Sequence, residues 1–222
     1  MTDEEIQEIE QEQRKQRFPA VLFSMWEEDG LHDKSYLRFS FDNDDKSNPK
    51  ISRLCQKYCT RIDDVKKNNI GILFFGDIGG GKSFFASCTC NEILNLKNTT
   101  ICATSISRIL NTAQSARDRQ RLIDRLSSYQ MLMLDDFGSE RGTEFAMEQV
   151  FSIIDARYRA QLPVIITTNL TLNEMENPTN ISDSRLFDRV LEMCPIRVHV
   201  PGSSKRKAEA ERRTQLAREL LK

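Results

Sequence analysis

Short apolar runs alternate with longer amphipathic stretches along most of the chain. Five runs rich in Ile, Leu, Val, Phe and Met predict buried strands, at residues 72–75, 99–103, 129–134, 163–168 and 196–200. Between and around them, apolar residues recur at helical spacing, which predicts helices over residues 50–67, 84–96, 105–126, 143–160, 182–192 and 203–222. Strands that alternate with helices and are apolar throughout are typical of a mostly parallel sheet covered on both faces. The expected fold class is therefore α/β.

The beginning of the chain does not follow this alternation. Residues 2–17 have a helical pattern but almost no apolar positions, so they form either a solvated tail or a segment that orders on a partner. Residues 18–26 contain an apolar cluster with the single Trp, which requires burial on the domain or on a partner. The predicted division is an N-terminal segment at 1–36, a core at 37–202 and a basic C-terminal helix at 203–222.

Composition narrows the class of protein. At 222 residues, with 39 % hydrophobic and 29 % charged residues, the chain fits one full α/β domain. The net charge of −1 gives no overall attraction to nucleic acid, so any such contact must be a local patch. The first 17 residues are too charged for a signal peptide, and no apolar run could span a membrane, so we expect a cytoplasmic protein. Six cysteines without a C-x-x-C pair favour small buried thiols over a metal site or disulfides.

The strongest chemical signal follows the first predicted strand. Residues 76–83 read G-D-I-G-G-G-K-S, the spacing of a phosphate-binding loop, with a strand before and a helix after. The glycines let backbone N–H groups turn inward, and these amides and the helix N-terminus then hold phosphate oxygens. Lys82 would reach the β- and γ-phosphates, and Ser83 would ligate Mg²⁺. The predicted nucleotide-binding residues are Gly76, Asp77, Ile78, Gly79, Gly80, Gly81, Lys82, Ser83 and Phe84.

Polar residues end two further strands, at the sheet edge where ligands of α/β proteins bind. The strand over residues 129–134 ends in Asp135 and Asp136. Asp135 would hold Mg²⁺ together with Ser83, and Asp136 would orient or deprotonate the attacking water. Asn169 follows the strand over residues 163–168, where its amide either bonds the γ-phosphate or the lytic water, or caps a helix or turn. No N-K-x-D motif for guanine follows, which favours ATP.

Three arginines in the last third of the chain complete the candidate site. Arg185, Arg189 and Arg206 carry planar guanidinium groups that suit transition-state phosphate charge. From the residues alone, each is either such a group or an ordinary surface charge.

Four stretches together resemble the AAA+ ATPases of the DnaC/DnaI helicase loaders and the related IstB transposition ATPases. They lie at residues 76–83, 134–140, 155–158 and 163–170, and the resemblance extends from about residue 37 to about residue 207. It implies a P-loop NTPase core of the AAA+/ASCE type, a three-layer sandwich on a five-stranded sheet with a reduced C-terminal lid. It also places Asn169 at sensor 1, Arg189 at the arginine finger that reaches a neighbouring subunit's nucleotide, and Arg206 at a sensor-2-like position. Arg185 would be a supporting residue.

The resemblance implies an ATP-dependent helicase loader of DNA replication. Such a protein would bind ATP and Mg²⁺, hydrolyse ATP, form a homo-oligomer in the ATP state, and contact single-stranded DNA and a replicative helicase. Many AAA+ ATPases have Glu where this chain has Asp136, so hydrolysis should be slow, and Glu140 is a second candidate base. The arginines between residues 108 and 125 would then face DNA, or else form a solvated helix face.

Other functions fit parts of the same pattern. An IstB-like transposition ATPase would bind DNA and a transposase instead of a helicase. A P-loop nucleotide kinase would use the arginines of residues 117–125 as a lid, but the paired aspartates, Asn169 and the arginine-finger segment argue against it. An adaptor that binds ATP only as an assembly signal would share the phosphate-binding loop without needing a base.

Overall fold

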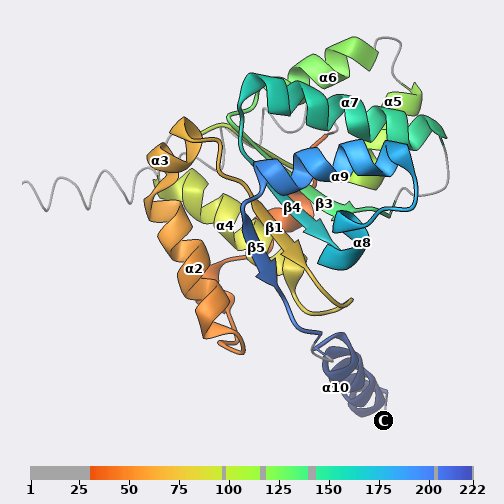
Figure 1. Cartoon of the computed structure of the whole chain (residues 1–222). Helices are drawn as coiled ribbons and strands as arrows, with labels where there is room; N and C mark the ends of the chain where they lie inside the picture. The colour runs from red at the N-terminus through yellow and green to blue at the C-terminus, as the bar shows by residue number, and fades with distance from the viewer. Residues whose placement is uncertain (1–30, 97–98, 116–118, 140–143, 203–204, 222) are drawn as a thin grey trace, which may run out of the picture.

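Five parallel strands form one sheet at the centre of the molecule (Figure 1). The computed structural model describes residues 31–96, 99–115, 119–139, 144–202 and 205–221. The strand order is β2-β3-β4-β1-β5, and all four neighbouring pairs are parallel. The strands are β1 (Ile72–Phe75), β2 (Ile101–Ser105), β3 (Met131–Phe137), β4 (Val164–Thr168) and β5 (Ile196–His199). All five predicted strands are present, so the prediction of an α/β fold with a five-stranded, mostly parallel sheet is confirmed.

Helices cover both faces of this sheet, because consecutive strand residues point to opposite sides. On one face, Leu73, Leu132 and Ile166 pack in a buried cluster with α5 (Ile106–Ser115), α6 (Arg119–Ser128), α7 (Glu144–Ala160), α8 (Leu172–Glu176) and α9 (Ile181–Met193). On the other face, Phe74, Met133 and Ile165 pack with α2 (Pro49–Thr60), α3 (Ile62–Lys67) and α4 (Lys82–Leu96). The result is the expected three-layer sandwich.

The structure corrects one predicted helix and adds detail in two other segments. The helix predicted over residues 50–67 is two helices, because the backbone of Arg61 leaves helical geometry (φ −104°, ψ 20°) between α2 and α3. The helix predicted over residues 105–126 is described as α5 and α6, with residues 116–118 outside the described ranges. Two short 3₁₀ helices, η1 (Lys34–Arg38) and η2 (Phe41–Asn43), precede α2 in a region where no helix was predicted. Side chains of Asp33 and Ser40 accept backbone N–H bonds at their first turns, which explains these helices.

Arg157 fixes the starts of β3 and β4. Its side chain on α7 is fully buried, and Nη1 donates to the carbonyls of Leu126 and Tyr129, each at 2.9 Å. Nη2 donates to the carbonyl of Pro163 at 2.8 Å. One guanidinium therefore joins the end of α6 to the residues that precede both strands. It holds the N-terminal ends of β3 and β4 in place relative to each other.

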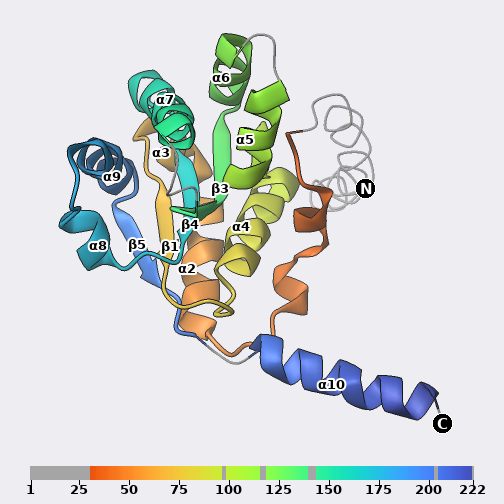
Figure 2. The same ribbon diagram turned by 90° about the vertical axis from the view of Figure 1, so that its right-hand side faces the viewer.

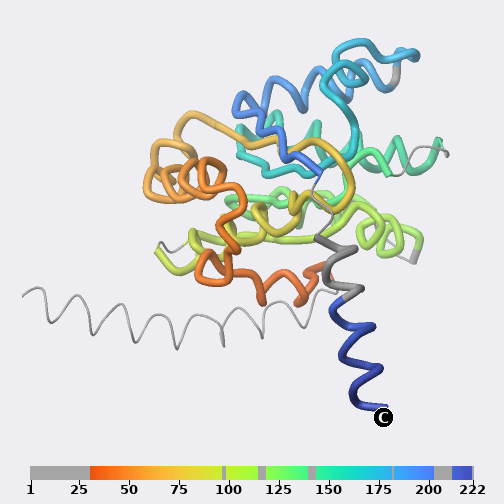
Figure 3. Tube along the Cα trace, turned by 90° about the horizontal axis from the view of Figure 1, so that it is seen from below, coloured from red at the N-terminus to blue at the C-terminus, as the bar shows by residue number. Residues whose placement is uncertain are grey.

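The last described helix, α10 (Lys205–Leu220), projects away from the domain (Figures 2 and 3). Its exposed apolar residues include Leu216 and Leu220. Among the residues that the structure describes, no helix is long and apolar enough to cross a membrane. All six cysteines are buried and carry free thiols, which agrees with the predicted buried thiols. The predicted helix at residues 2–17 and the apolar cluster at residues 18–26 lie outside the described residues.

Candidate functional site

A cleft of about 880 Å³ lies at the carboxyl ends of β1, β3 and β4. It brings together the glycine-rich loop after β1, Asp136 at the end of β3 and Asn169 directly after β4. These are the groups that the sequence predicts at one edge of the sheet. The described lining residues are Arg38, Phe39, Asn43, Asp45, Ile78, Gly79, Gly81, Lys82, Ser83, Phe84, Asp136, Ser139, Asn169 and Arg213.

The loop needs glycine where it leaves β1. Gly76 has φ +128°, and a Cβ at this position would lie 2.4 Å from the Val200 carbonyl oxygen. Gly81, the last residue before α4, has φ +98°. L-residues rarely adopt such angles, so the turn from strand to helix depends on these glycines.

Lys82, the first residue of α4, turns back onto the loop. Its Nζ donates to the carbonyl of Gly76 at 2.8 Å and to the carbonyl of Asp77 at 2.7 Å, and the residue is buried. Ser83 is half-buried beside it and lines the same cleft. A cation and a hydroxyl therefore stand at the N-terminus of a long helix, an arrangement suited to an anionic ligand.

Asp135 and Asp136 lie where the pairing of β3 with β4 becomes irregular. The register with β4 shifts between Leu134 and Phe137, and Asp136 has φ +58°. Asp136 is exposed in the cleft, and its N–H donates to Thr167 Oγ1 at 3.0 Å. Asp135 is buried and is not among the described residues that line the cleft. The two carboxylates therefore lie in different environments, one exposed and one buried.

Both oxygens of the Asp135 carboxylate accept hydrogen bonds. Thr167 Oγ1 on β4 donates to Oδ1 at 2.6 Å, and the Tyr36 hydroxyl on η1 donates to Oδ2 at 2.9 Å. Burial, followed by the negative charge of Asp135, raises the pKa of Tyr36 far above its usual value, so its hydroxyl stays protonated. The carboxylate is held from two elements that are distant in sequence.

Residues 38–45 form one wall of the cleft, and the sequence pattern did not identify them as site residues. The Phe39 ring meets the Phe84 ring edge-on, with centroids 5.6 Å apart, and the Arg38 guanidinium lies 4.9 Å from the Phe39 ring centroid. The resemblance to the family begins at about residue 37, but it assigned no site role to residues 38–45. No spacing rule connects them to a loop some 40 residues later, so only the folded structure shows this wall.

Arg189 packs within its own chain in this structure. Its Nη2 lies 2.7 Å from Asp155 Oδ1 on α7, and its guanidinium lies 4.5 Å from the Phe151 ring centroid. It is absent from the described lining of the nucleotide cleft. A role in a neighbouring subunit's site therefore stays a prediction.

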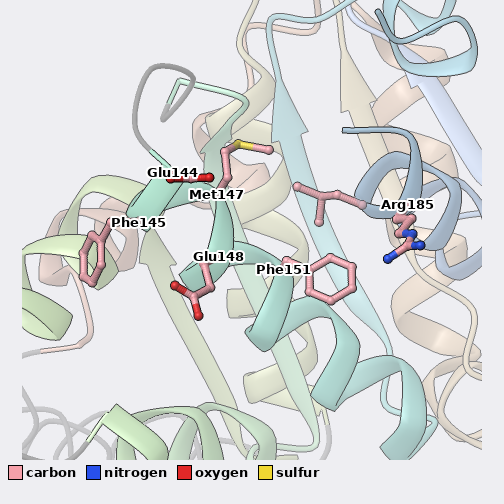
Figure 4. Close-up of a pocket in the computed structure, with 7 residues that line it drawn as sticks. Glu144, Phe145, Met147, Glu148, Phe151 and Arg185 are labelled. Atoms are coloured by element: carbon pink, nitrogen blue, oxygen red, sulfur yellow. The ribbon is translucent and has the colours of Figure 1, made fainter. Parts of the chain in front are cut away.

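Arg185 lines a second hollow of about 480 Å³ between α7 and α9. Figure 4 shows Arg185 and Phe145 at its opposite ends, with Glu148 and Phe151 between them. None of its lining residues also lines the cleft. Arg206 belongs to α10, but its side chain lies outside the described part, and Glu140 lies in the undescribed range 140–143.

Two of the arginines expected to face DNA contact other side chains of the domain. Arg108 Nη2 lies 3.5 Å from Asp33 Oδ2, and the Arg119 guanidinium lies 4.8 Å from the Phe145 ring centroid. Arg117 lies outside the described residues. The arrangement leaves both alternatives, DNA contact and solvated face, open.

Comparison with known proteins identifies the family. The family model described as "IstB-like ATP binding protein" matches residues 5–213. The replicative helicase loader DnaC of Escherichia coli (strain K12) is 24 % identical over 134 residues, covering 58 % of this chain and 53 % of DnaC. The replicative helicase loader DnaI of Bacillus subtilis (strain 168) is 23 % identical over 141 residues, covering 58 % of this chain and 45 % of DnaI. The chain thus matches about half the length of these curated relatives.

A solved structure supports the same fold. The crystal structure of DnaI superimposes with a TM-score of 0.65 at 18 % identity, covering 77 % of this chain and 92 % of that one. At this identity the likeness establishes the fold and leaves the activity to other evidence.

Proposed function

Because this chain belongs to the family of IstB-like ATP binding proteins, we propose that it is a cytoplasmic, ATP-dependent helicase loader of DNA replication. In this proposal it binds and hydrolyses ATP with Mg²⁺, forms a homo-oligomer, and contacts single-stranded DNA and a replicative helicase. The observation that carries the proposal is the cleft, where the glycine-rich loop, Asp136 and Asn169 meet around Lys82 and Ser83. The similarity to the loaders DnaC and DnaI supports the choice of partner.

The residues present fit a magnesium nucleotide. The loop ends at the N-terminus of α4, where backbone N–H groups of the helix can hold phosphate oxygens. Ser83 supplies a hydroxyl in the cleft, and Asp135 supplies a carboxylate whose orientation two donors fix. When bound, Mg²⁺ neutralises phosphate charge. Ser83 and Asp135 are the residues that we propose to hold it.

Each of the remaining polar groups has a task that its position allows. Lys82 would exchange the two loop carbonyls that it now binds for phosphate oxygens. Asp136 would orient or deprotonate the attacking water, and Asn169 would bind that water or the γ-phosphate. Because Asp is one methylene shorter than Glu, we expect slow hydrolysis by the protein alone.

Phosphate release with and without single-stranded DNA tests the activity. Lys82→Ala should abolish release, because the cation that neutralises phosphate charge is lost. Lys50→Ala, an exposed lysine on α2, is the matched control and should behave as the wild type. Full activity in Lys82→Ala would overturn the assignment of the site.

Mixing two inactive variants tests the trans role of Arg189. Arg189→Ala should lose hydrolysis while still binding ATP, whereas lost binding would point to a structural arginine. If the arginine acts on the next subunit, mixing Arg189→Ala with Lys82→Ala restores activity at about one interface in four, where an intact loop meets an intact arginine. A mixture that stays inactive would assign Arg189 to its own chain or to structure.

An IstB-like transposition ATPase is the second candidate, because the family match carries the IstB description. Affinity purification of the full chain with ATP, against the replicative helicase and in parallel against a transposase from the same genome, separates the two. Retention of the helicase alone supports the loader. Retention of the transposase alone overturns it in favour of the second candidate.

A further inference from the structure

Tyr36 lies outside every sequence motif of the site, yet it contacts the centre of that site. It stands 99 positions before Asp135, and its hydroxyl reaches Asp135 Oδ2 at 2.9 Å in a buried contact. Thr167 occupies the other carboxylate oxygen. With one donor on each oxygen, the plane of the carboxylate cannot rotate without breaking a hydrogen bond.

The segment that carries Tyr36 is itself firmly attached. The Asn91 side-chain amide on α4 donates to the carbonyls of Tyr36 and Phe39, at 2.9 Å and 2.7 Å. At the other end of η1, the Asp33 N–H donates to the carbonyl of Ala103 on β2 at 3.1 Å. Figure 2 shows this segment (red to orange) running alongside α4. Tyr36 is therefore fixed relative to the helix that begins with Lys82 and Ser83.

A second buried tyrosine shows what a purely structural role looks like. Tyr58 on α2 donates its hydroxyl to the backbone carbonyl of Ile70 at 2.7 Å. That bond ties α2 to the segment that leads into β1, and Ile70 is not among the described cleft residues. Tyr36 is also buried and its hydroxyl also donates one hydrogen bond, but its acceptor is the carboxylate that we assign to Mg²⁺. Because the two tyrosines differ mainly in the acceptor of this hydrogen bond, Tyr58 serves as the control for Tyr36.

We propose that Tyr36 is a positioning residue of the magnesium site, whose hydroxyl holds the Asp135 carboxylate in the orientation that receives the ion. This inference rests on the proposed function only in that Asp135 serves a divalent cation. A partner that orients a metal-binding carboxylate typically contributes tenfold or more to metal affinity. Loss of the hydroxyl should therefore weaken metal binding without weakening nucleotide binding.

The test compares Tyr36→Phe with Tyr58→Phe in the full chain. Mn²⁺ binding to the ADP-loaded protein, measured by electron paramagnetic resonance, reports the metal without requiring hydrolysis. Tyr36→Phe should weaken Mn²⁺ binding about tenfold, leave ADP binding in EDTA unchanged, and raise the Mg²⁺ concentration for half-maximal hydrolysis. Each variant loses one buried hydrogen bond, so both should lower the melting temperature by similar amounts. Tyr58→Phe should nevertheless leave Mn²⁺ binding at the wild-type value.

Asn91→Ala is a second variant, because it loosens η1 but keeps the Tyr36 hydroxyl. It should weaken Mn²⁺ binding in the same direction by a smaller factor. Wild-type or tighter Mn²⁺ binding in Tyr36→Phe would overturn the proposal. If wild-type protein binds Mn²⁺·ADP and Tyr36→Phe weakens it, but neither hydrolyses ATP, the positioning role stands and the ATPase proposal fails. A wild-type protein that binds no Mn²⁺ with ADP would overturn both.

Discussion

Replacing Arg157 by Met should destabilise the domain more than any ordinary surface change. The substitution keeps most of the side-chain volume but removes the guanidinium that donates to the carbonyls of Leu126, Tyr129 and Pro163. A hydrogen bond from a charged donor contributes roughly 1.5–3 kcal/mol, so three contribute about 5–9 kcal/mol. The Pro163 carbonyl keeps a second donor, the Leu132 amide at 3.4 Å, which reduces the loss.

Removing the buried charge offsets part of this cost. Burial lowers the pKa of Arg157 to about 9, which shows that the folded protein disfavours the charge relative to water. Desolvation of a buried ion costs several kcal/mol, and Met recovers that amount. The net expected loss is about 3–4 kcal/mol, a large share of the roughly 5–15 kcal/mol that stabilises a typical domain.

Urea unfolding followed by circular dichroism measures this loss. For a slope of about 2–3 kcal/mol per molar urea, the midpoint should fall by about 1–2 M with an unchanged slope. Arg159→Met is the control, because Arg159 lies on the same helix and its side chain is 76 % exposed, so solvent screens its ion pair with Asp155. It should cost about 0.5 kcal/mol or less. Equal midpoints for the two variants would refute the role assigned to Arg157.

Three further predictions follow from burial and backbone geometry. Burial, followed by the charge of Arg108, lowers the pKa of His32 from 6.5 to about 4. The unfolded chain then binds more protons between these pH values, so stability should fall by on the order of 2 kcal/mol as pH drops from 6.5 to 4. His32→Gln should flatten the dependence of stability on pH, whereas His199→Gln, at the exposed second histidine, should keep it. Equal slopes of the unfolding free energy against pH in the two variants would contradict the reasoning. Burial raises the pKa of Cys55 to about 11 and that of Cys88 to about 12. A thiol reagent at pH 8 should therefore label these cysteines at least about 100-fold more slowly in the native protein than in the urea-unfolded protein. Rapid labelling of the native protein would show that these thiols are accessible. Gly76→Ala should abolish binding of a fluorescent ATP analogue, because its Cβ would press on the Val200 carbonyl, and normal binding would show that the loop can shift.

The central sheet and the phosphate-binding loop were predictable because both depend on local pattern. Buried parallel strands are apolar along their whole length, and the loop has a fixed spacing that its backbone geometry requires. The split at Arg61 was not predictable in the same way, since the apolar spacing continues through the break between α2 and α3. Periodicity reports which face is buried, and it says little about where one helix ends and the next begins.

The second half of the site was harder to predict, because its contacts join residues that are distant in sequence. The strand pattern placed Asp135 and Asp136 together, but the shift in register against β4 at these residues is not visible in that pattern. The bond between Tyr36 and Asp135 spans 99 positions and leaves no periodic signal. The ion pair between Arg189 and Asp155 likewise joins two helices that the sequence shows only as separate patterns.

The position of Tyr36 has a thermodynamic consequence for the N-terminal segment. If that segment orders on a partner, as one sequence-based alternative holds, the segment from Leu31 to Phe39 connects the partner to the metal site, because Leu31 is buried in the domain core and Tyr36 bonds Asp135. Coupling between two binding sites is reciprocal: a partner that shifts η1 and changes metal affinity must itself bind with an affinity that depends on the metal. Loosening η1 with Asn91→Ala would then weaken this dependence without touching either ligand. A partner whose affinity ignores Mg²⁺ in the nucleotide-bound protein would show that η1 supports the carboxylate but transmits nothing.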